Sequence, residues 1–338
     1  MGEDELQVPS CEFQVSAAVQ GSRSKVQGFL FLTFDFSSSL EAYSRKPFFV
    51  AIVYLMLKAG DMTIHFLNAG FWWDDGGAQF GIVPRELWEK EKPANARHRI
   101  KMSLTCPLIL TEREVILVDT GIGNRLSERE QQIYTPEPSD RLVNGLRQRG
   151  LTPQDVTHVV LSHLHFDHVG GVIDKSSTGE IRPIFTNARF YIQKWEWELA
   201  LAPTDERLAA AYRHAPECLR ALEKVTLVDG DAQIVAHVRT AISGGHTDLH
   251  QCVIVEGGGT GLIHLGDIVP TTSHLRLAWN AAYDTNPLGT IAAKKRFFAE
   301  ARTKNLWISF SHDDKVAAGL LDKEEGKTPR LLETMSIS

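Results

Sequence analysis

From residue 62 onwards, short segments typical of strands alternate with longer segments typical of helices. In a strand, hydrophobic residues recur at every second position or form a short buried run, whereas on an amphipathic helix they recur every three or four residues. These patterns predict strands at 63–67, 99–110, 114–119, 157–162, 189–193, 224–228, 233–239, 250–256, 261–266 and 306–310, and helices at 139–149, from 194 to about 222 and at 288–302. Strand-rich runs with few helices in both halves are compatible with an α/β fold in which two sheets pack face to face with helices outside.

Residues 1–61 differ from this pattern, because their two apolar runs, 28–36 and 48–57, have no clear period. The second run is about half as long as a membrane-spanning helix requires. It starts nearly fifty residues into the chain without a small-residue cleavage site after it, which argues against a signal peptide and favours a buried strand or helix. We therefore divide the chain into an N-terminal extension, 1–61, and a domain, 62–338, and expect no membrane association. The extension's role as an edge addition, an oligomerisation arm or an upstream misread start is left open.

Composition and charge argue against several classes of function. The chain has 338 residues, of which 43% are hydrophobic and 23% charged, and its net charge is -6. No basic stripe of the kind that binds nucleic acid is visible. The four cysteines are widely spaced without a CxxC pair, which argues against a disulfide framework and a thiolate zinc site. We expect reduced thiols in a cytoplasmic protein that acts on a small molecule, and a homo-oligomer is left open.

The most informative segment follows the predicted strand 157–162. Four candidate metal ligands, His163, His165, Asp167 and His168, lie within six residues. Imidazole and carboxylate groups suit zinc and neighbouring divalent metals. A turn after a strand can direct alternate residues to one point, so His163 and His165 can share one metal while Asp167 and His168 face a second. The glycines at 170 and 171 are expected to let the backbone bend tightly there.

Three further candidate ligands follow predicted strands later in the chain. His246 lies in the glycine-containing turn 244–247, Asp267 follows the apolar run 262–265, and His312 follows the strand 306–310. Taken singly, each is weak, because a histidine or aspartate at a strand end is more often a cap or a surface residue. Their occurrence in this order after the HxHxDH motif makes them strong candidates for further ligands of the same metal site.

The complete pattern, HxHxDH…H…D…H, resembles that of the metallo-β-lactamase superfamily over roughly residues 62–338. This resemblance implies a four-layer αββα sandwich and two bound divalent metal ions, with zinc expected. It also implies the following roles: His163, His165 and His246 hold the first metal, Asp167, His168 and His312 hold the second, and Asp267 bridges the two. Asp119 resembles the aspartate of the superfamily's DTG motif, which orients the metal-binding histidines without binding metal. A simple turn carboxylate is the alternative for Asp119.

The resemblance implies hydrolysis by a hydroxide that bridges the two metals and attacks an ester, a lactone or a related carbonyl substrate. Asp167 is the candidate catalytic residue, because it can orient the hydroxide and accept a proton. The bridging Asp267 favours the glyoxalase II, lactonase and phosphodiesterase branches over true β-lactamases, which lack it. The segment 165–168 resembles N-acyl homoserine lactonases, but residues 268–270 lack the substrate-facing tyrosine that those enzymes carry after the bridging aspartate.

A low-charge substrate pocket is the last expectation from the sequence. Phe71, Trp72 and Trp73 lie in a segment that we interpret as a loop, which either forms the wall of an apolar pocket or is anchored by a buried aromatic cluster. His274 follows Asp267 by seven residues and is a further candidate for the pocket. The few basic residues after the motifs are Lys175, Arg182 and Arg276. A neutral or weakly charged ester or lactone therefore fits better than a highly anionic phosphate.

Two alternative activities remain open at this point. The first is hydrolysis of phosphodiesters or phosphotriesters by the same metal pair. The second is an iron-dependent redox reaction, as in some members of the same superfamily. Flavodiiron-type oxidases normally carry a glutamate at the position of His165 and an added flavodoxin domain, and this chain has neither. Persulfide-oxidising relatives use one iron, whereas this chain has a complete second set of ligands.

Overall fold

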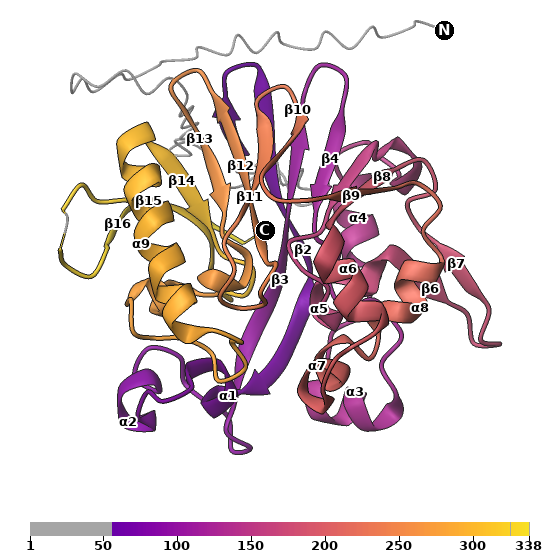
Figure 1. The fold of residues 1–338 in the computed structure, drawn as a ribbon, viewed down its shortest axis with the longest axis horizontal. Helices are drawn as coiled ribbons and strands as arrows, with labels where there is room; N and C mark the ends of the chain where they lie inside the picture. The colour runs from indigo at the N-terminus through magenta and orange to yellow at the C-terminus, as the bar shows by residue number, and fades with distance from the viewer. Residues whose placement is uncertain (1–55, 325, 338) are drawn as a thin grey trace, which may run out of the picture. The chain divides into compact units, whose positions relative to one another are not determined.

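Two seven-stranded sheets form the centre of the described part of the chain (Figure 1). The computed structural model describes residues 56–324 and 326–337. The first sheet has the order β1-β2-β3-β4-β5-β8-β9. Its strands are β1 (Met56–Ala59), β2 (Met62–Asp75), β3 (Arg99–Leu110), β4 (Val115–Val118), β5 (His158–Val160), β8 (Arg189–Gln193) and β9 (Val225–Val228). β4, β5, β8 and β9 run parallel, so their carboxyl ends meet at one edge.

The second sheet has the order β10-β11-β12-β13-β14-β15-β16. Its strands are β10 (Ala232–Val235), β11 (Val238–Ile242), β12 (Gln251–Gly257), β13 (Thr260–His264), β14 (Leu306–Ser309), β15 (Val316–Leu321) and β16 (Leu331–Ser336). Within this second sheet, as described, β13 and β14 are the only strands that pair in parallel. The long helix α9 (Pro287–Lys304) lies between them in the chain. A separate ribbon consists of β6 (Ile173–Lys175) and β7 (Ile181–Pro183).

Helices cover the outer face of each sheet. α9 packs against β13 and β14, whereas α4 (Arg141–Arg147) packs on β2, and α6 (Lys194–Leu201) on β8 and β9 (Figure 1). The other helices are α1 (Gly76–Phe80), α2 (Arg85–Trp88), α3 (Glu128–Tyr134), α5 (Phe166–Val169), α7 (Glu206–Tyr212) and α8 (Ala215–Arg220). This order of layers confirms the predicted αββα sandwich. Within the described residues, no helix is both long and apolar enough to span a membrane.

Three hydrophobic clusters fill the spaces between the four layers. Between the two sheets, Phe66 and Val118 of the first sheet join Val253 and Leu262 of the second in one buried cluster. A second cluster lies between the first sheet and its helices, and a third lies between the second sheet and α9. The interior-facing strands therefore bury side chains on both faces, and β3 and β12 are accordingly buried over most of their length.

The aromatic segment that we interpreted as a loop is the end of a strand, so this expectation is wrong. β2 continues to Asp75, and after an irregularity between Asn68 and Phe71 its pairing with β3 resumes at Phe71 and Ser103. The helix α1 follows directly and begins after Asp75, whose side chain accepts a hydrogen bond from Ala78 N. Because side chains alternate between the faces of a strand, neighbouring aromatic residues here point in opposite directions.

Two predicted segments are divided in the structure. The strand expected at 233–239 is two strands, β10 and β11, and His237 between them has a φ of 67°, a left-handed conformation that ends one strand and reverses the chain. The helix expected from 194 to about 222 is three short helices, α6, α7 and α8. Proline at 203, within the link between α6 and α7, is consistent with this division, since proline disfavours the helical conformation of the residue before it.

The proposed domain limits can be tested by shortening the chain. Most of the extension 1–61, including nearly all of the apolar run 48–57, lies outside the described residues. Its last part contains β1, an edge strand that pairs with β2 and buries Leu57 and Ala59. We expect a chain starting at Met62 to fold and bind metal, with a free energy of unfolding lower by about 2 kcal/mol because Leu57 is lost.

The measurement is chemical denaturation of chains that start at Met56 and at Met62, compared with the full chain. The chain starting at Met56 is the control and should match the full chain in stability. An insoluble or metal-free chain from Met62 would assign residues 56–61 to the essential core. If the chain from Met56 failed in the same way, residues before β1 would belong to that core.

Candidate metal centre

The HxHxDH motif lies directly after the carboxyl end of β5. His163 and His165 follow β5, and His165 has the extended backbone that precedes the four-residue helix α5, which carries Asp167 and His168. Gly170 has an ordinary helical φ of −60°, so the expected tight bend is not the reason for glycine there. A Cβ on Gly170 would lie 1.9 Å from Ile122 O, and one on Gly171 would lie 2.1 Å from Thr120 O. The two glycines are required because the chain passes directly against the 119–123 turn.

The second sheet brings the other three predicted ligands to the same place. β13 and β14 are parallel and pair His264 with Ser309, so Asp267 and His312 leave adjacent strand ends at nearly equal distances. His246 lies in the turn after β11, in which Gly244 and Gly245 have φ of 62° and 87°. These left-handed conformations favour glycine, and they reverse the chain so that His246 faces His165.

The seven predicted ligands converge in two adjacent groups. The first group is His163, His165 and His246, and the second group is Asp167, His168, Asp267 and His312; within each group the potential ligand atoms all lie within 4.8 Å of one another. His246 Nε2 lies 3.0 Å from His165 Nδ1, and His168 Nε2 lies 3.2 Å from His312 Nε2.

Asp267 lies between the two groups. Its Oδ1 lies 3.1 Å from His312 Nε2 and 3.3 Å from His168 Nε2, in the second group. Its Oδ2 lies 3.4 Å from His246 Nε2 and 4.0 Å from His163 Nε2, in the first group. One oxygen of the carboxylate thus faces each group, as a bridging ligand requires.

The protonation states of His163, His165 and Asp267 suit the binding of cations. Burial lowers the pKa of His163 and of His165 well below the usual value, so both rings stay neutral and keep a lone pair. Burial alone would raise the pKa of Asp267, but the surrounding histidines hold it well below its ordinary range. His163 Nε2 and Asp267 Oδ1 are buried without a hydrogen-bond partner among the described residues. Unpaired buried polar atoms are costly, and a divalent cation would satisfy both.

Asp119 lies behind the second group and does not face the ligand atoms. Its Oδ1 accepts a hydrogen bond from Ser162 N at 2.8 Å, and its Oδ2 accepts one from Ser162 Oγ at 2.8 Å and lies 2.9 Å from His168 Nδ1. His264 Nε2 lies 3.5 Å from the same Oδ2. Asp119 therefore fixes the ring of His168 with its Nε2 towards the site.

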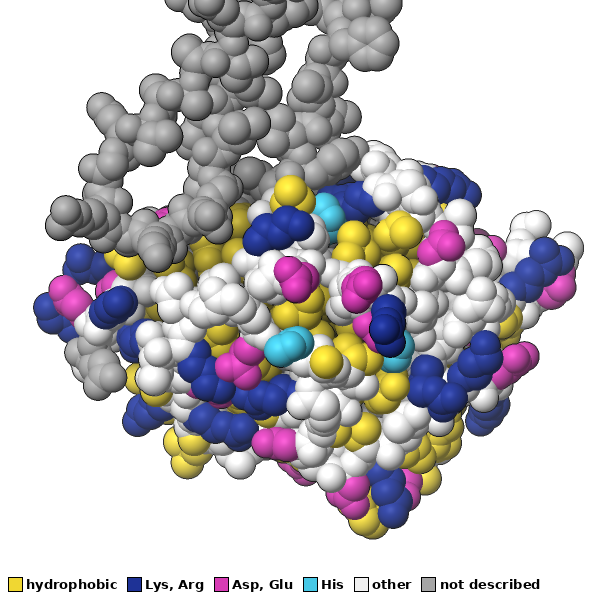
Figure 2. All heavy atoms as spheres, turned by 90° about the horizontal axis from the view of Figure 1, so that it is seen from above, with side chains coloured by type: hydrophobic (Ala, Val, Ile, Leu, Met, Phe, Trp, Pro, Cys, Tyr) yellow, Lys and Arg dark blue, Asp and Glu magenta, His cyan; other side chains and the backbone are white. Residues whose placement is uncertain are grey.

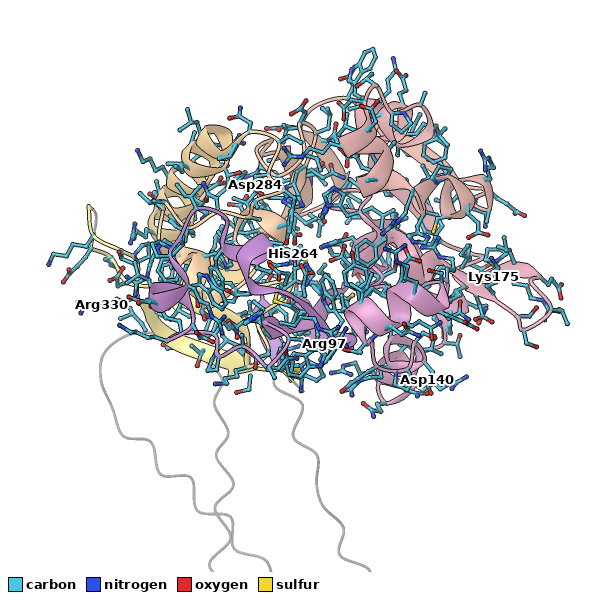
Figure 3. All side chains as sticks on the ribbon, turned by 90° about the horizontal axis from the view of Figure 1, so that it is seen from below. Arg97, Asp140, Lys175, His264, Asp284 and Arg330 are labelled. Carbon is cyan, nitrogen blue, oxygen red and sulfur yellow. The ribbon has the colours of Figure 1, made fainter. Side chains whose placement is uncertain are left out.

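Two buried carboxylates near the first group were missed by sequence reasoning. Asp284 Oδ1 lies 2.9 Å from His246 Nδ1. Glu196 accepts hydrogen bonds from Leu164 N at 3.2 Å, Thr247 Oγ1 at 2.9 Å and Tyr212 OH at 2.9 Å, and so ties the His163–His165 segment to the His246 turn. Neither residue belongs to a recognisable motif. In the view of Figure 3, Asp284 and His264 lie towards the middle, whereas Lys175 and Arg330 lie at opposite edges of the molecule.

A cavity of about 340 Å³ opens beside the two groups. Its wall includes the aromatic rings of Trp72, Tyr134 and Phe166, which pack together with centroids 5.0–5.7 Å apart. Asp167 and Asp267 reach its floor, and α7 forms the opposite wall with Leu208 and Ala211. The combination of a mostly apolar wall with a few polar groups is typical of a small-molecule site.

Of the four residues expected at a pocket, only Trp72 lines this cavity. Trp72 is buried and contacts the ring of His312, with centroids 5.9 Å apart. The neighbours Phe71 and Trp73 point to the other face of β2, where Phe71 contacts the amine of Lys101. His274 is buried away from the cavity, stacked on Phe80 with its Nε2 2.9 Å from Gln79 O, and burial lowers its pKa to about 3.

Several polar residues at the cavity come from segments without a motif. Tyr283 and Asp74 line it, and burial raises the pKa of Asp74 to about 6 and that of Tyr283 well above 10. Arg207 and Arg213 of the α7 region also line it, a feature that a search for basic residues next to the motifs overlooks. Arg207 donates hydrogen bonds to the carbonyls of Ala282 and Asp284, and Arg213 pairs with Glu130.

Comparison with known sequences gives a consistent family match. Residues 105–312 match the family described as the metallo-beta-lactamase superfamily. An N-acyl homoserine lactonase of Bacillus thuringiensis is 28% identical over 176 residues, which cover 49% of this chain and 63% of the lactonase. A probable metallo-hydrolase of Mycobacterium tuberculosis is 25% identical over 190 residues, with 49% and 57% covered. The matches thus span less than two thirds of these relatives.

Solved structures match over a larger share of the chain. A probable metal-dependent hydrolase from Staphylococcus aureus has a TM-score of 0.74 and 32% identity, covering 83% of this chain and 98% of its own. A dizinc quorum-quenching lactonase has a TM-score of 0.67 and 21% identity, covering 83% and 98%. At that identity the second likeness concerns the fold alone.

Proposed function

The chain belongs to the metallo-β-lactamase superfamily, and we propose that it is a metal-dependent hydrolase of carboxylic esters or lactones. The observation that carries this proposal is the placement of Asp267, with one carboxylate oxygen towards each of two ligand groups beside a largely apolar cavity. We propose two divalent cations, zinc by donor type: three imidazoles in the first group, and two imidazoles and two carboxylates in the second.

When bound, two divalent cations lower the pKa of a water molecule towards neutrality and polarise the carbonyl of the substrate. Within the chain, Asp167 has the position to act on that water. Its Oδ2 lies 3.3 Å from His312 Nε2 and 3.6 Å from His168 Nε2, and the residue also lines the cavity. We assign to Asp167 the orientation of the attacking water and the acceptance of its proton.

The cavity wall supplies orientation for the rest of the substrate. The Trp72, Tyr134 and Phe166 rings offer an apolar surface to an acyl or aryl group and exclude water from the reacting carbonyl. Tyr283 retains its proton at neutral pH because its pKa lies well above 10, so its hydroxyl can donate a hydrogen bond to a substrate oxygen. Tyr283 thus offers a phenol at the cavity although residues 268–270 contain none.

Charge favours an ester or lactone over a polyanion. Lys175, Arg182 and Arg276 each pair with a glutamate and none lines the cavity. Of the two arginines at the cavity, Arg213 pairs with Glu130, and Arg207 donates its hydrogen bonds to the carbonyls of Ala282 and Asp284. On the face drawn in Figure 2, basic and acidic side chains are interspersed, with no stripe of one sign. These features support a small substrate of low charge and give no support to nucleic acid as a partner.

A substrate panel tests the proposal. The protein, stripped of metal and reloaded with zinc, is assayed with aryl esters, lactones, thioesters, phosphodiesters and phosphotriesters. We expect kcat/KM for aryl esters or lactones to exceed that for phosphodiesters, because the cavity wall is mostly apolar and its two arginines, Arg207 and Arg213, already bond backbone carbonyls and Glu130.

The stripped protein without added metal is the control and should be inactive on every substrate. Preferential cleavage of phosphodiesters or phosphotriesters would overturn the ester assignment while keeping the metal centre. Metal analysis that finds a single iron per active chain would instead favour the redox alternative.

A further inference from the structure

We propose that Asp284 is a positioning residue for the first metal, acting through the ring of His246. The inference rests on the proposed metal-dependent function and concerns a residue that belongs to none of the sequence motifs. It follows from the contacts of one loop, 281–286, which lies between the cavity and α9.

The hydrogen bonds of Asp284 hold its carboxylate against the ring of His246. Its Oδ1 lies 2.9 Å from His246 Nδ1, and its Oδ2 accepts a hydrogen bond from Thr290 Oγ1 at 2.8 Å. The side chains of Asp284 and His246 are 1% and 0% exposed, so water does not compete for these bonds. Because a carboxylate only accepts, His246 Nδ1 must carry the proton, and the lone pair is left on Nε2.

That lone pair faces the first group. His246 Nε2 lies 3.0 Å from His165 Nδ1 and 3.4 Å from Asp267 Oδ2. A carboxylate behind a metal-binding histidine fixes the tautomer and the ring orientation and makes the imidazole a stronger ligand. Asp284 therefore has the same relation to His246 in the first group as Asp119 has to His168 in the second.

The backbone around Asp284 is held against the His246 turn. Thr285 N donates to His246 O at 3.1 Å, and Asn286 N donates to Gly245 O at 2.9 Å. A Cβ on Gly245 would lie 2.6 Å from Thr290 N, so the turn contacts the start of α9 directly. This close packing leaves Asp284 little freedom to turn away from His246.

The same loop also forms part of the substrate cavity. Tyr283 and Thr285, which flank Asp284, line the cavity, and Arg207 of α7 donates hydrogen bonds to the carbonyls of Ala282 and Asp284. The loop thus places a cavity residue and a support for His246 on adjacent positions. A change at Asp284 should consequently affect metal binding first, with substrate binding altered less.

The test is zinc affinity of the full chain, measured by competition with a chromogenic chelator, for the unchanged protein and Asp284→Asn. The amide keeps the size of the side chain but removes its charge. We expect the variant to bind one zinc ion about 10–100-fold more weakly and the other with unchanged affinity. Visible absorption of the cobalt-loaded protein should show altered bands for one of the two ions.

Two controls separate positioning from general destabilisation. The first control is Asp248→Asn, which makes the same chemical change two residues after His246. Asp248 is exposed and accepts a hydrogen bond from Thr285 Oγ1, and its replacement should leave the affinities for both zinc ions unchanged. In the His246→Ala background, Asp284→Asn should cause no further loss of affinity for the remaining ion, because the residue acts only through that ring.

Equal zinc affinities for Asp284→Asn and the unchanged protein would overturn the inference. A loss of affinity that persists in the His246→Ala background would do so too, since it would indicate a structural role. An unchanged protein that binds fewer than two divalent ions would instead contradict the proposed dinuclear centre, so the two failures are distinguishable.

Discussion

Replacing Asp167 with alanine is expected to abolish the hydrolysis of aryl esters and lactones together with binding of the second metal ion. Asp167 is both a member of the second ligand group and the proposed proton acceptor at the cavity floor. Loss of the proton-transfer group alone costs about 10²–10⁴-fold in rate. Loss of the ion adds to this, so activity should fall to the background of the metal-free protein.

The measurement combines kcat/KM for an aryl ester with metal content per chain. Asp174→Ala is a matched control: this exposed carboxylate lies on β6, seven residues later, and bonds Asn124. It should keep both ions and full activity. Retention of esterase activity by Asp167→Ala would refute the role of Asp167, and the metal-centre assignment would then be hard to maintain.

The second prediction concerns Asp119→Asn, which should retain two metal ions but lose about 10–100-fold in activity or in metal affinity. The amide keeps an oxygen acceptor but places an NH2 group at one carboxylate oxygen, either Oδ1, which accepts from Ser162 N, or Oδ2, which contacts Ser162 Oγ and His168 Nδ1. Asp119 has a φ of 57°, and asparagine is among the residues that adopt this conformation readily, so the backbone should be preserved.

Metal content and steady-state kinetics decide the outcome, and Ser162→Ala provides the comparison. That variant removes the Ser162 Oγ bond to Asp119 but leaves the His168 contact, so its loss should be smaller. Complete loss of one ion in Asp119→Asn would mean that Asp119 is itself a ligand. Full activity and unchanged metal affinity in Asp119→Asn would mean that Asp119 only stabilises the turn and does not orient His168.

Local sequence was sufficient to predict those strands and ligands whose positions depend only on neighbouring residues in the chain. Alternation and apolar runs identified β3, β4, β5 and β14 to within a few residues, because burial of a strand imposes its pattern directly on the sequence. The HxHxDH segment was recognisable for the same reason, since the end of one strand and one short helix carry four of the candidate ligands.

Other local interpretations failed where two conformations share one pattern. Phe71, Trp72 and Trp73 suit a loop or a strand end equally well by composition, and their pairing with β3 decides for the strand. Only then does the alternation of side chains select Trp72 for the cavity and exclude its neighbours. The role of Gly170 likewise depends on the distant backbone of Ile122.

The sequence by itself determined the candidate ligands, since they lie in motifs with a fixed order. The resemblance of this order to that of a known superfamily then implied the αββα arrangement. Tertiary structure alone decided which groups support the ligands. Asp284 meets His246 across 38 residues, and Glu196 meets Thr247 across 51. Such contacts arise from the packing of α9 and of the α6–α7 region around the site. A buried aspartate that orients a ligand and one that caps a turn look alike in a sequence, because their difference lies in the partner and not in the residue.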